Sequence, residues 1–304
     1  MSTTTDRIYD LSQIWASAKE VFPYFDRLES DWDEKYYKVI ERLLDGCDEA
    51  EFHKLLSDFV AFLNDGHTKY IPPDGYRETK AVVRPEAPTY SVENMILTIK
   101  INEFLTDHAQ FVKDTLNANP ECKLVRLDIR DNIGGNTAYA AKVAELFISG
   151  VFHGCQKWTQ VRKAIDIASA SQIVCSSEEK LQKYIKDGLL DEEELSNSKR
   201  VANRTNYELY TDTFGEENNV AVYNGSLELL ISGRTISVAE DFAAMFRSNH
   251  RAALIGEPTA GTTGTPCIIK LRCGGRAQIV SVGYRLLDGT EFIGKGIETD
   301  VYEK

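Results

Sequence analysis

The chain has 304 residues, of which 42% are hydrophobic and 27% charged, values that are ordinary for a globular protein. This length exceeds that of a usual single domain, so we expect one large domain with a smaller appendage. The net charge of −12 argues against nucleic acid or an anionic membrane as the main partner. No run approaches the roughly 18 apolar residues that a membrane helix needs, so no membrane span is predicted.

The first six residues (MSTTTD) have neither the basic nor the apolar region of a signal peptide. This favours a cytoplasmic location, with an exported form that has lost its signal as the alternative. The six cysteines contain no C-x-x-C pair, and the five histidines contain no H-E-x-x-H spacing. We therefore expect reduced thiols and predict neither a metal nor a cofactor.

The amino-terminal part of the chain is predicted to be helical. Apolar residues recur at helical spacing over 11–22, with Pro23 ending the pattern, and a second helix begins near residue 32. A third apolar stripe covers 52–63. We assign residues 1–72 to an N-terminal helical domain.

Beyond residue 72 the pattern becomes that of an α/β protein. Strands are predicted at 94–101 and 122–129, and helices at 106–117 and 136–148. We assign residues 73–304 to this core.

An insertion in the core is predicted at about 151–217. It has a strand near 152–161 and one strongly charged helix over about 176–196. From residue 227 the core resumes with a strand, a helix, a strand at 253–255 and a hairpin that turns at 273–275.

The motif at residues 235–240 (TISVAE) lies between an apolar run and a helical pattern. At such a strand-to-helix junction, backbone N–H groups converge and the helix dipole favours negative charge. Ser237 therefore has a position that suits an oxygen nucleophile and the oxyanion it creates. The alternative is a capping box in which Ser237 and Glu240 only start the helix.

A glycine pair, Gly134 and Gly135, closes the stretch 128–135 (DIRDNIGG). Without side chains in the way, the backbone N–H groups of such a pair can face outward and donate to a developing oxyanion. The alternative is a tight turn before a helix. Neither the dinucleotide nor the P-loop glycine pattern is present, so a phosphate loop is not favoured.

His67 follows a glycine in the polar loop 64–70 (NDGHTKY). In this setting a histidine is exposed enough to titrate and to reach a neighbouring domain. The alternative is a surface residue without a catalytic role. The later stretch 256–264 (GEPTAGTTG) is either a wall of the substrate cleft or a flexible surface loop.

In their chain order, these segments resemble the tail-specific (C-terminal-processing) serine proteases and the core of the tricorn protease. The resemblance covers almost the whole chain and rests on residues 65–68 (DGHT), 128–135, 235–240 and 294–301 (GKGIETDV). It implies an α/β (α+β) fold with a ClpP/crotonase-like core and an N-terminal helical domain.

The resemblance also implies roles for individual residues. The nucleophile of the family falls on Ser237. The oxyanion hole falls on the backbone of Gly134 or Gly135 and on the N–H of Val238.

Two departures from the family narrow this interpretation. Many members use a lysine about 25 residues after the serine, but here Thr262 occupies that position, and a neutral threonine cannot accept the serine proton. No PDZ domain is evident between the helices and the core, only the short segment around 71–93. Both departures favour the Ser–His branch, which resembles tricorn-like and nisin-resistance-type proteases, and His67 matches the base of that branch.

We therefore expect a serine endopeptidase that acts through an acyl-enzyme, with Ser237 as nucleophile and His67 as general base. Glu240 is expected to order the site. Glu298 is a second candidate for this role, since the tricorn site recruits a glutamate from its C-terminal region. Peptides or unfolded proteins are the expected substrates, and the insertion and the fold relatives make a homo-oligomer plausible.

Two other functions share parts of this evidence. A catalytically silent protein that binds an apolar ligand or a peptide is suggested by the missing lysine and by retinoid-binding relatives of the family. Retention of Ser237, His67 and the glycine pair argues against it. An acyl-CoA enzyme of the crotonase kind shares the double-glycine feature but does not explain His67.

Overall fold

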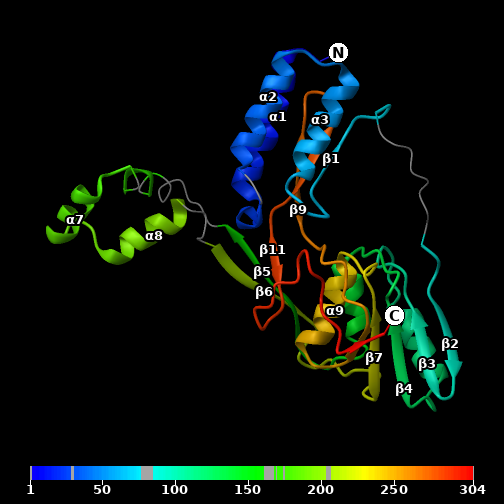
Figure 1. Ribbon diagram of the computed structural model, residues 1–304. Coiled ribbons are helices and arrows are strands. Elements are labelled where there is room, and N and C mark those ends of the chain that lie inside the picture. Colours follow the sequence, from blue (N-terminus) through cyan, green and yellow to red (C-terminus); the bar gives the residue numbers. More distant parts are fainter. Residues whose placement is uncertain are drawn as a thin grey trace. The chain divides into compact units, whose positions relative to one another are not determined.

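The computed structural model describes residues 2–28, 31–76, 85–160, 168, 170–173, 175–202 and 207–303 (Figure 1). By its contacts the chain divides into two units. One unit comprises Met1–Lys157 and Thr211–Lys304, and the other comprises Trp158–Tyr210. The N-terminal helices therefore group with the core, and the middle of the insertion forms a unit of its own.

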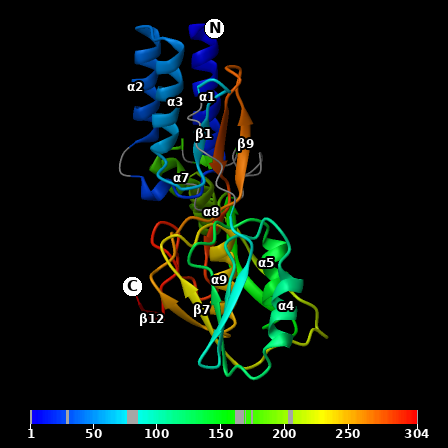
Figure 2. The same ribbon diagram turned by 90° about the vertical axis from the view of Figure 1, so that its right-hand side faces the viewer.

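Three helices occupy the amino-terminal part, as the apolar spacing predicts: α1 (Thr4–Val21), α2 (Trp32–Leu44) and α3 (Glu49–Ala61). A short 3-10 turn, η1 (Phe25–Arg27), follows α1. Each α-helix begins at a polar cap, which satisfies amide groups that have no partner within the helix; the caps are Thr3, Asp31 and Asp48. Figure 2 shows these helices side by side, with β1 and β9 along them.

The central sheet has the strand order β12-β8-β7-β4-β3-β2. Its strands are β2 (Thr89–Glu93), β3 (Ile96–Lys100), β4 (Leu124–Asp128), β7 (Ser226–Ile231), β8 (Ala253–Gly256) and β12 (Val301–Tyr302). All neighbours are parallel except β2 and β3, which form an antiparallel pair. This mixed sheet with helices confirms the predicted α/β class.

Parallel pairing decides where the loops of the sheet meet. In the β4–β7 pair, Asp128 lies opposite Leu230, so the carboxyl ends of both strands reach the same edge. The glycine turn follows β4 and the serine loop follows β7. These two segments are about 100 residues apart in the chain and are therefore brought together at the edge where open α/β sheets usually bind ligands.

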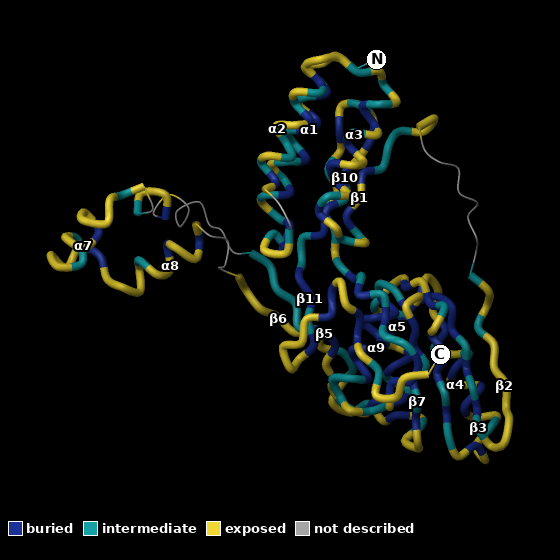
Figure 3. The backbone as a smooth tube through the Cα atoms, viewed as in Figure 1, coloured by how far each residue is buried: buried dark blue, intermediate teal, exposed yellow. Residues whose placement is uncertain are grey.

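Three helices pack with the sheet: α4 (Ala109–Ala118), α5 (Thr137–Ala144) and α9 (Val238–Ser248). Every residue of α9 from 238 to 246 is buried (Figure 3). Its Phe242 ring lies 5.0 Å from that of Phe104, between ring centres. A helix that is buried on all sides is held firmly, so its amino terminus is a rigid platform.

A second sheet joins the helical part to the C-terminal part of the chain. The strands β9 (Pro266–Lys270) and β10 (Arg276–Val280) form the predicted hairpin, and β1 (Lys69–Ile71) pairs antiparallel with β10. The buried carboxylate of Asp10 in α1 accepts the backbone N–H groups of Arg272 and Cys273 at 2.8 and 2.9 Å. Asp10 thus fixes α1 to the turn of the hairpin, while the β1–β10 pairing fixes the loop before β1, which contains His67.

A third sheet has the order β11-β5-β6, built from β5 (Phe152–Gln160), β6 (Tyr207–Phe214) and β11 (Gly283–Arg285). The strand β5 confirms the strand predicted near 152–161, except that Val161 lies outside the described residues. The strand β6 was not predicted.

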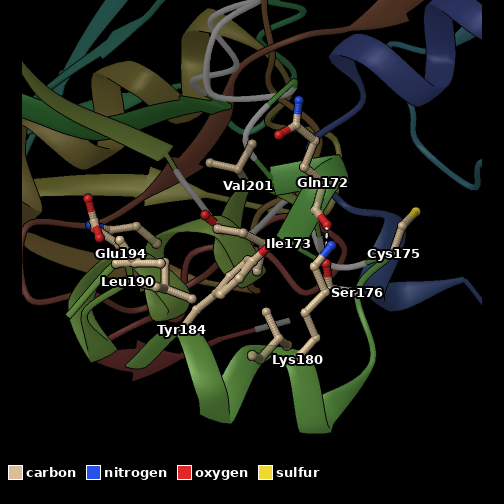
Figure 4. Close-up of a pocket in the computed structure, with 13 residues that line it drawn as sticks. Gln172, Ile173, Cys175, Ser176, Lys180, Tyr184, Leu190, Glu194 and Val201 are labelled. Atoms are coloured by element: carbon tan, nitrogen blue, oxygen red, sulfur yellow. Dashed lines mark hydrogen bonds between the residues drawn. The ribbon is translucent and has the colours of Figure 1, made fainter. Parts of the chain in front are cut away.

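The single charged helix predicted over 176–196 is wrong. The structure has two helices there, α7 (Glu178–Lys186) and α8 (Glu192–Ala202). Gly188 between them has a φ of +69°, a left-handed conformation that ends a helix. A pocket of about 710 Å³ lies within the unit Trp158–Tyr210, and its lining includes Ile173, Tyr184 and Leu190 (Figure 4).

Candidate active site

Ser237 is the N-cap residue of α9 and has a φ of 59° and a ψ of −130°. A non-glycine residue with such a positive φ is strained, and strain of this kind occurs mostly at functional sites. The serine side chain makes no capping hydrogen bond. The capping-box interpretation is therefore wrong, and the hydroxyl is left for another partner.

The loop that presents Ser237 is fixed from below by Thr235. The fully buried hydroxyl of Thr235 donates to the carbonyl of Ile129 at 3.0 Å and accepts the N–H of Ser232 at 3.0 Å. The serine loop is thus tied to the end of the neighbouring strand β4.

His67 contacts Ser237 directly. Its Nε2 lies 3.0 Å from Ser237 Oγ, and its Nδ1 lies 2.9 Å from Thr262 Oγ1. The backbone of His67 is also held, because its N–H donates to Asp65 Oδ1 at 3.0 Å and its carbonyl accepts from Gln278 Nε2 at 2.8 Å. Both the ring and its backbone therefore have a fixed orientation.

Burial lowers the pKa of His67 below its ordinary value of 6.5, although Asp65 opposes this shift and Lys69 adds to it. Desolvation disfavours the charged imidazolium, so the neutral ring predominates at neutral pH. A neutral imidazole has one nitrogen free to accept a proton. The side chain is thus in the protonation state that a general base requires.

Thr262 joins the loops of the histidine and the serine. Its carbonyl accepts the N–H of Ser237 at 3.0 Å, while its hydroxyl contacts the His67 ring. A Cβ atom at Gly66 would lie 2.1 Å from Thr262 Oγ1, so only glycine allows this approach. The role of Thr262 was not predicted.

Glu240 lies fully buried under the Thr262 loop. Its carboxylate accepts the hydroxyl of Thr259 at 2.6 Å and the N–H groups of Gly261 and Thr262 at 2.7 Å each. Burial raises its pKa to about 7, against the opposing effect of these hydrogen bonds. Glu240 thus fixes the loop around Thr262, whose hydroxyl contacts His67. In the described part of the chain, its carboxylate makes no hydrogen bond to Ser237 or His67.

The glycine pair lies against the serine. Gly134 has a φ of +85°, and a Cβ atom there would be 2.7 Å from Ser237 Cβ and 2.9 Å from Val238 N. The N–H of Gly134 already donates to Asn132 Oδ1 at 2.9 Å. Within the described residues, the N–H groups of Gly135 and Val238 have no hydrogen-bond acceptor.

Asn132 connects the glycine turn to the serine loop. It is fully buried, its Nδ2 donates to the carbonyl of Ile101 at 2.9 Å, and its own carbonyl accepts the N–H of Ile236 at 3.1 Å. Asn132 lies within the glycine motif at 128–135, but the sequence pattern alone predicts no role for it. A short amide side chain between a strand end and a glycine pair is the signal for such a turn.

The structure does not bring Glu298 to this site. Its side chain is exposed, and its backbone carbonyl accepts from Arg247 Nη2 at 2.5 Å. Both ring nitrogens of His67 are already engaged by Ser237 and Thr262. The prediction that Glu298 orients the site therefore has no support in the geometry.

Among the described residues, no group of three or more His, Cys, Asp or Glu side chains is arranged to hold a metal ion. No helix in the described ranges combines the length and the apolar character needed to cross a membrane.

A serine and a histidine in hydrogen-bond contact recur in hydrolases of unrelated folds. Residues 95–303 match Peptidase family S41, and the chain belongs to this family. It is accordingly a peptidase of mixed α/β fold. No curated protein sequence matches the chain significantly.

Solved structures with the same fold cover nearly the whole chain. A structure assigned as a peptidase from Parabacteroides merdae ATCC 43184 has a TM-score of 0.70 at 17% identity, over 100% of this chain and 90% of that one. Mature CPAF complexed with lactacystin has a TM-score of 0.66 at 12% identity, over 98% and 94%. The photosystem II D1 C-terminal processing protease has a TM-score of 0.58 at 12% identity, over 100% and 94%. At these identities the likeness concerns the fold.

Proposed function

We propose that the protein is a serine endopeptidase in which Ser237 is the nucleophile and His67 the general base. The observation that carries this proposal is the 3.0 Å contact between His67 Nε2 and Ser237 Oγ, at the amino terminus of a buried helix. This distance lies within the hydrogen-bond reach that proton transfer requires. Membership of a peptidase family supplies the reaction class.

The protonation state of the ring follows from its two partners. Ser237 must donate its proton to Nε2, so the hydrogen of the neutral ring lies on Nδ1 and is donated to Thr262 Oγ1, 2.9 Å away. Thr262 thus accepts the Nδ1 hydrogen of this tautomer, as a carboxylate does in the Ser-His-Asp triad.

The reaction then proceeds through acylation of Ser237 and deacylation by water, with two proton transfers in each step. Ser237 Oγ bonds to the peptide carbonyl carbon as Nε2 takes its proton, and the imidazolium returns that proton to the leaving amine as the C–N bond breaks. A water molecule next attacks the acyl-enzyme, again giving its proton to Nε2. Collapse of this second intermediate returns the proton to Ser237 and releases the acid.

The developing oxyanion is assigned to the N–H groups of Gly135 and Val238. Val238 follows Ser237 in the chain, and Gly135 follows Gly134, which packs against Ser237. Neither N–H has another acceptor within the described residues. The N–H of Gly134 is committed to Asn132 and is a poorer candidate. Loss of one such donor typically lowers kcat by about 100- to 1000-fold.

Within the family, we assign the chain to a Ser–His branch without a PDZ domain, similar to tricorn-like and nisin-resistance-type proteases. Supporting this, Thr262 stands at the position of the dyad lysine and its hydroxyl contacts the His67 ring. Residues 72–88 connect β1 to β2, and this stretch is too short for a domain. Peptides or unfolded proteins are the proposed substrates.

The test uses an unstructured, quenched-fluorescent peptide and three purified variants. Ser237→Ala and His67→Ala should each lose at least about 1000-fold in kcat, because the nucleophile and the base act as a unit. Ser248→Ala, at the opposite end of α9, is the matched control and should keep wild-type turnover. A fluorophosphonate probe should label Ser237 alone.

Either of two results contradicts the proposal. One is wild-type turnover in Ser237→Ala or His67→Ala, and the other is labelling of a different residue. A protein that binds peptide without turnover and stays unlabelled would instead be a binding protein on this scaffold.

A further inference from the structure

The segment before α4 contains a carboxylate whose hydrogen bonds are unusually complete. Glu103 is 8% exposed and accepts the backbone N–H of Leu105. It also accepts the N–H of Thr106 at 3.0 Å and the hydroxyl of Thr106 at 2.8 Å. The Nε2 of buried His108 lies 2.7 Å from the same carboxylate. Four donors therefore converge on one side chain.

These donors keep the carboxylate ionised. Burial by itself raises the pKa of Glu103, but the hydrogen bonds from Thr106, His108 and Leu105 outweigh it, and the net shift is downward. The peptide between Phe104 and Leu105 is thereby fixed by a charged acceptor at one end, which is a strong form of hydrogen bond.

The glycine turn rests on this peptide and on the preceding one, between Glu103 and Phe104. The N–H of Phe104 donates to the carbonyl of Gly134 at 2.8 Å, and the N–H of Asn136 donates to the carbonyl of Phe104 at 2.8 Å. A Cβ atom at Gly135 would lie 2.2 Å from the carbonyl carbon of Phe104 and 2.5 Å from Leu105 N. Gly135 therefore packs directly on the peptide that Glu103 holds.

The geometry of a trans peptide turns this packing into an orientation. The carbonyl and the N–H of one trans peptide point in opposite directions. Because the Gly134 carbonyl points to Phe104, the Gly135 N–H must point away from Phe104. The Cα of Gly134 faces Ser237 and Val238 N on another side of the same turn.

We infer that Glu103 is a positioning residue that sets the direction of the Gly135 N–H through the two peptides that flank Phe104. This inference rests on the proposed function, in which that N–H stabilises the oxyanion. Glu103 itself touches neither Ser237 nor His67 by any hydrogen bond found among the described residues. Its effect reaches the site through the peptides of Phe104 and then through the Gly134–Gly135 peptide.

The decisive variant is Glu103→Gln. A glutamine can keep its amide oxygen on the Leu105 and Thr106 N–H groups, but it carries no negative charge, so these hydrogen bonds lose their charge-assisted strength. The Phe104–Leu105 peptide should then be held less firmly, and the Gly135 N–H with it. We expect kcat on the quenched-fluorescent peptide to fall at least about tenfold with KM changed less than about threefold, since the lost interaction exists only in the transition state.

A transition-state probe separates positioning from general damage. A peptide aldehyde that forms a hemiacetal with Ser237 should bind Glu103→Gln more weakly by the same factor as the loss in kcat/KM. The cleaved product peptide should bind both proteins equally. Asp107→Asn is the matched control, because it removes a helix-start carboxylate and an ion pair with Lys142 from the same loop without touching Phe104. It should stay within about twofold of wild type.

The backbone amide signal of Gly135 in an NMR spectrum gives a readout that does not need activity. It should shift in Glu103→Gln and stay unchanged in Asp107→Asn. Wild-type kcat in Glu103→Gln, or an unchanged Gly135 signal, overturns the inference. If the wild-type protein hydrolyses no peptide, the proposed function fails, and the Gly135 signal still decides whether Glu103 sets this N–H.

Thr106→Val serves if Glu103→Gln does not fold. It deletes one donor and leaves the carboxylate in place. A smaller loss of kcat, about threefold, with an unchanged KM supports the inference. Full wild-type kcat together with an unmoved Gly135 signal contradicts it.

Discussion

The hydroxyl of Thr262 lies 2.9 Å from Nδ1 of His67, and Nε2 of the same ring lies 3.0 Å from Ser237 Oγ. The histidine is thus held between two hydroxyl groups. A hydroxyl can accept the Nδ1 hydrogen as a carboxylate does, but it can also donate to Nδ1, and it offers no negative charge to the imidazolium. Thr262 also receives the Ser237 N–H on its carbonyl, so one residue positions both partners.

This arrangement makes Thr262 a sensitive position. Thr262→Val keeps the shape of the side chain but removes the acceptor for Nδ1–H, so the ring can adopt the wrong tautomer. We expect kcat to fall by about 10- to 100-fold, with KM little changed. Thr262→Ser retains the hydroxyl and should keep at least about a third of wild-type kcat. Equal activity in the Val and Ser variants would argue against any role of this hydroxyl.

The close approach of Gly66 to Thr262 gives a second prediction. In Gly66→Ala the new methyl group would lie 2.1 Å from Thr262 Oγ1, so one of the two loops must move. We expect a loss of at least about tenfold in kcat, because a displacement of about 1 Å is enough to separate a nucleophile from its base. Gly233→Ala is the control, since its nearest neighbour is 4.0 Å away. Similar kinetics for both alanine variants would contradict this account.

The lowered pKa of His67 predicts the pH profile. Only the neutral ring can accept the serine proton, and burial places its pKa below 6.5. On the acidic side, kcat/KM should therefore fall with a midpoint below pH 6.5. The measurement is kcat/KM for the unstructured peptide in a series of buffers at constant ionic strength. An acidic limb centred above pH 6.5 would mean that another group controls the rate.

Glu240 predicts how stability depends on pH. Its pKa rises from 4.5 in the unfolded chain to about 7 in the folded protein, through burial. The folded state therefore binds the proton more tightly, and the resulting stabilisation is complete below pH 4.5 and lost as pH rises through about 7. Relative to Glu240→Gln, which does not titrate, the wild type should lose about 3 kcal/mol of unfolding free energy over this range.

Urea unfolding of both proteins at pH 4.5, 6 and 8 measures this difference. Asp241, whose pKa burial raises to about 6, is common to both proteins, so its contribution should largely cancel. A difference between the two proteins that stays the same at all three pH values would show that Glu240 has no raised pKa.

The segments of the candidate site could be located in the sequence because each carries a local pattern. A glycine pair after a strand, a serine before a buried helix and a histidine after Asp65 and Gly66 are all visible in short windows. The α/β class and the hairpin at 273–275 follow from equally local signals. These elements depend on contacts between residues close together in the chain.

The partners of these residues could not be predicted, because they depend on pairing over long distances. Thr262 meets His67 across 195 residues of chain, and only the pairing of β1 with β10 brings their loops together. Glu240 has the spacing of a capping box, yet tertiary structure turns its side chain to a loop 19 to 22 residues further on. Short or exposed strands such as β1 and β6 give too weak a pattern to be seen.

The pairing of β1 with β10 has a consequence for when the site can exist. The Val280 N–H donates to the Thr68 hydroxyl at 3.0 Å, and Gln278 holds the carbonyl of His67. During synthesis the base is made early, but the strand that fixes it is made more than 200 residues later. A chain still growing on the ribosome, or a product truncated before residue 276, has the serine and the histidine without their alignment. The contact between His67 and Ser237 can therefore have its supporting strand only after residues 276–280 have been made.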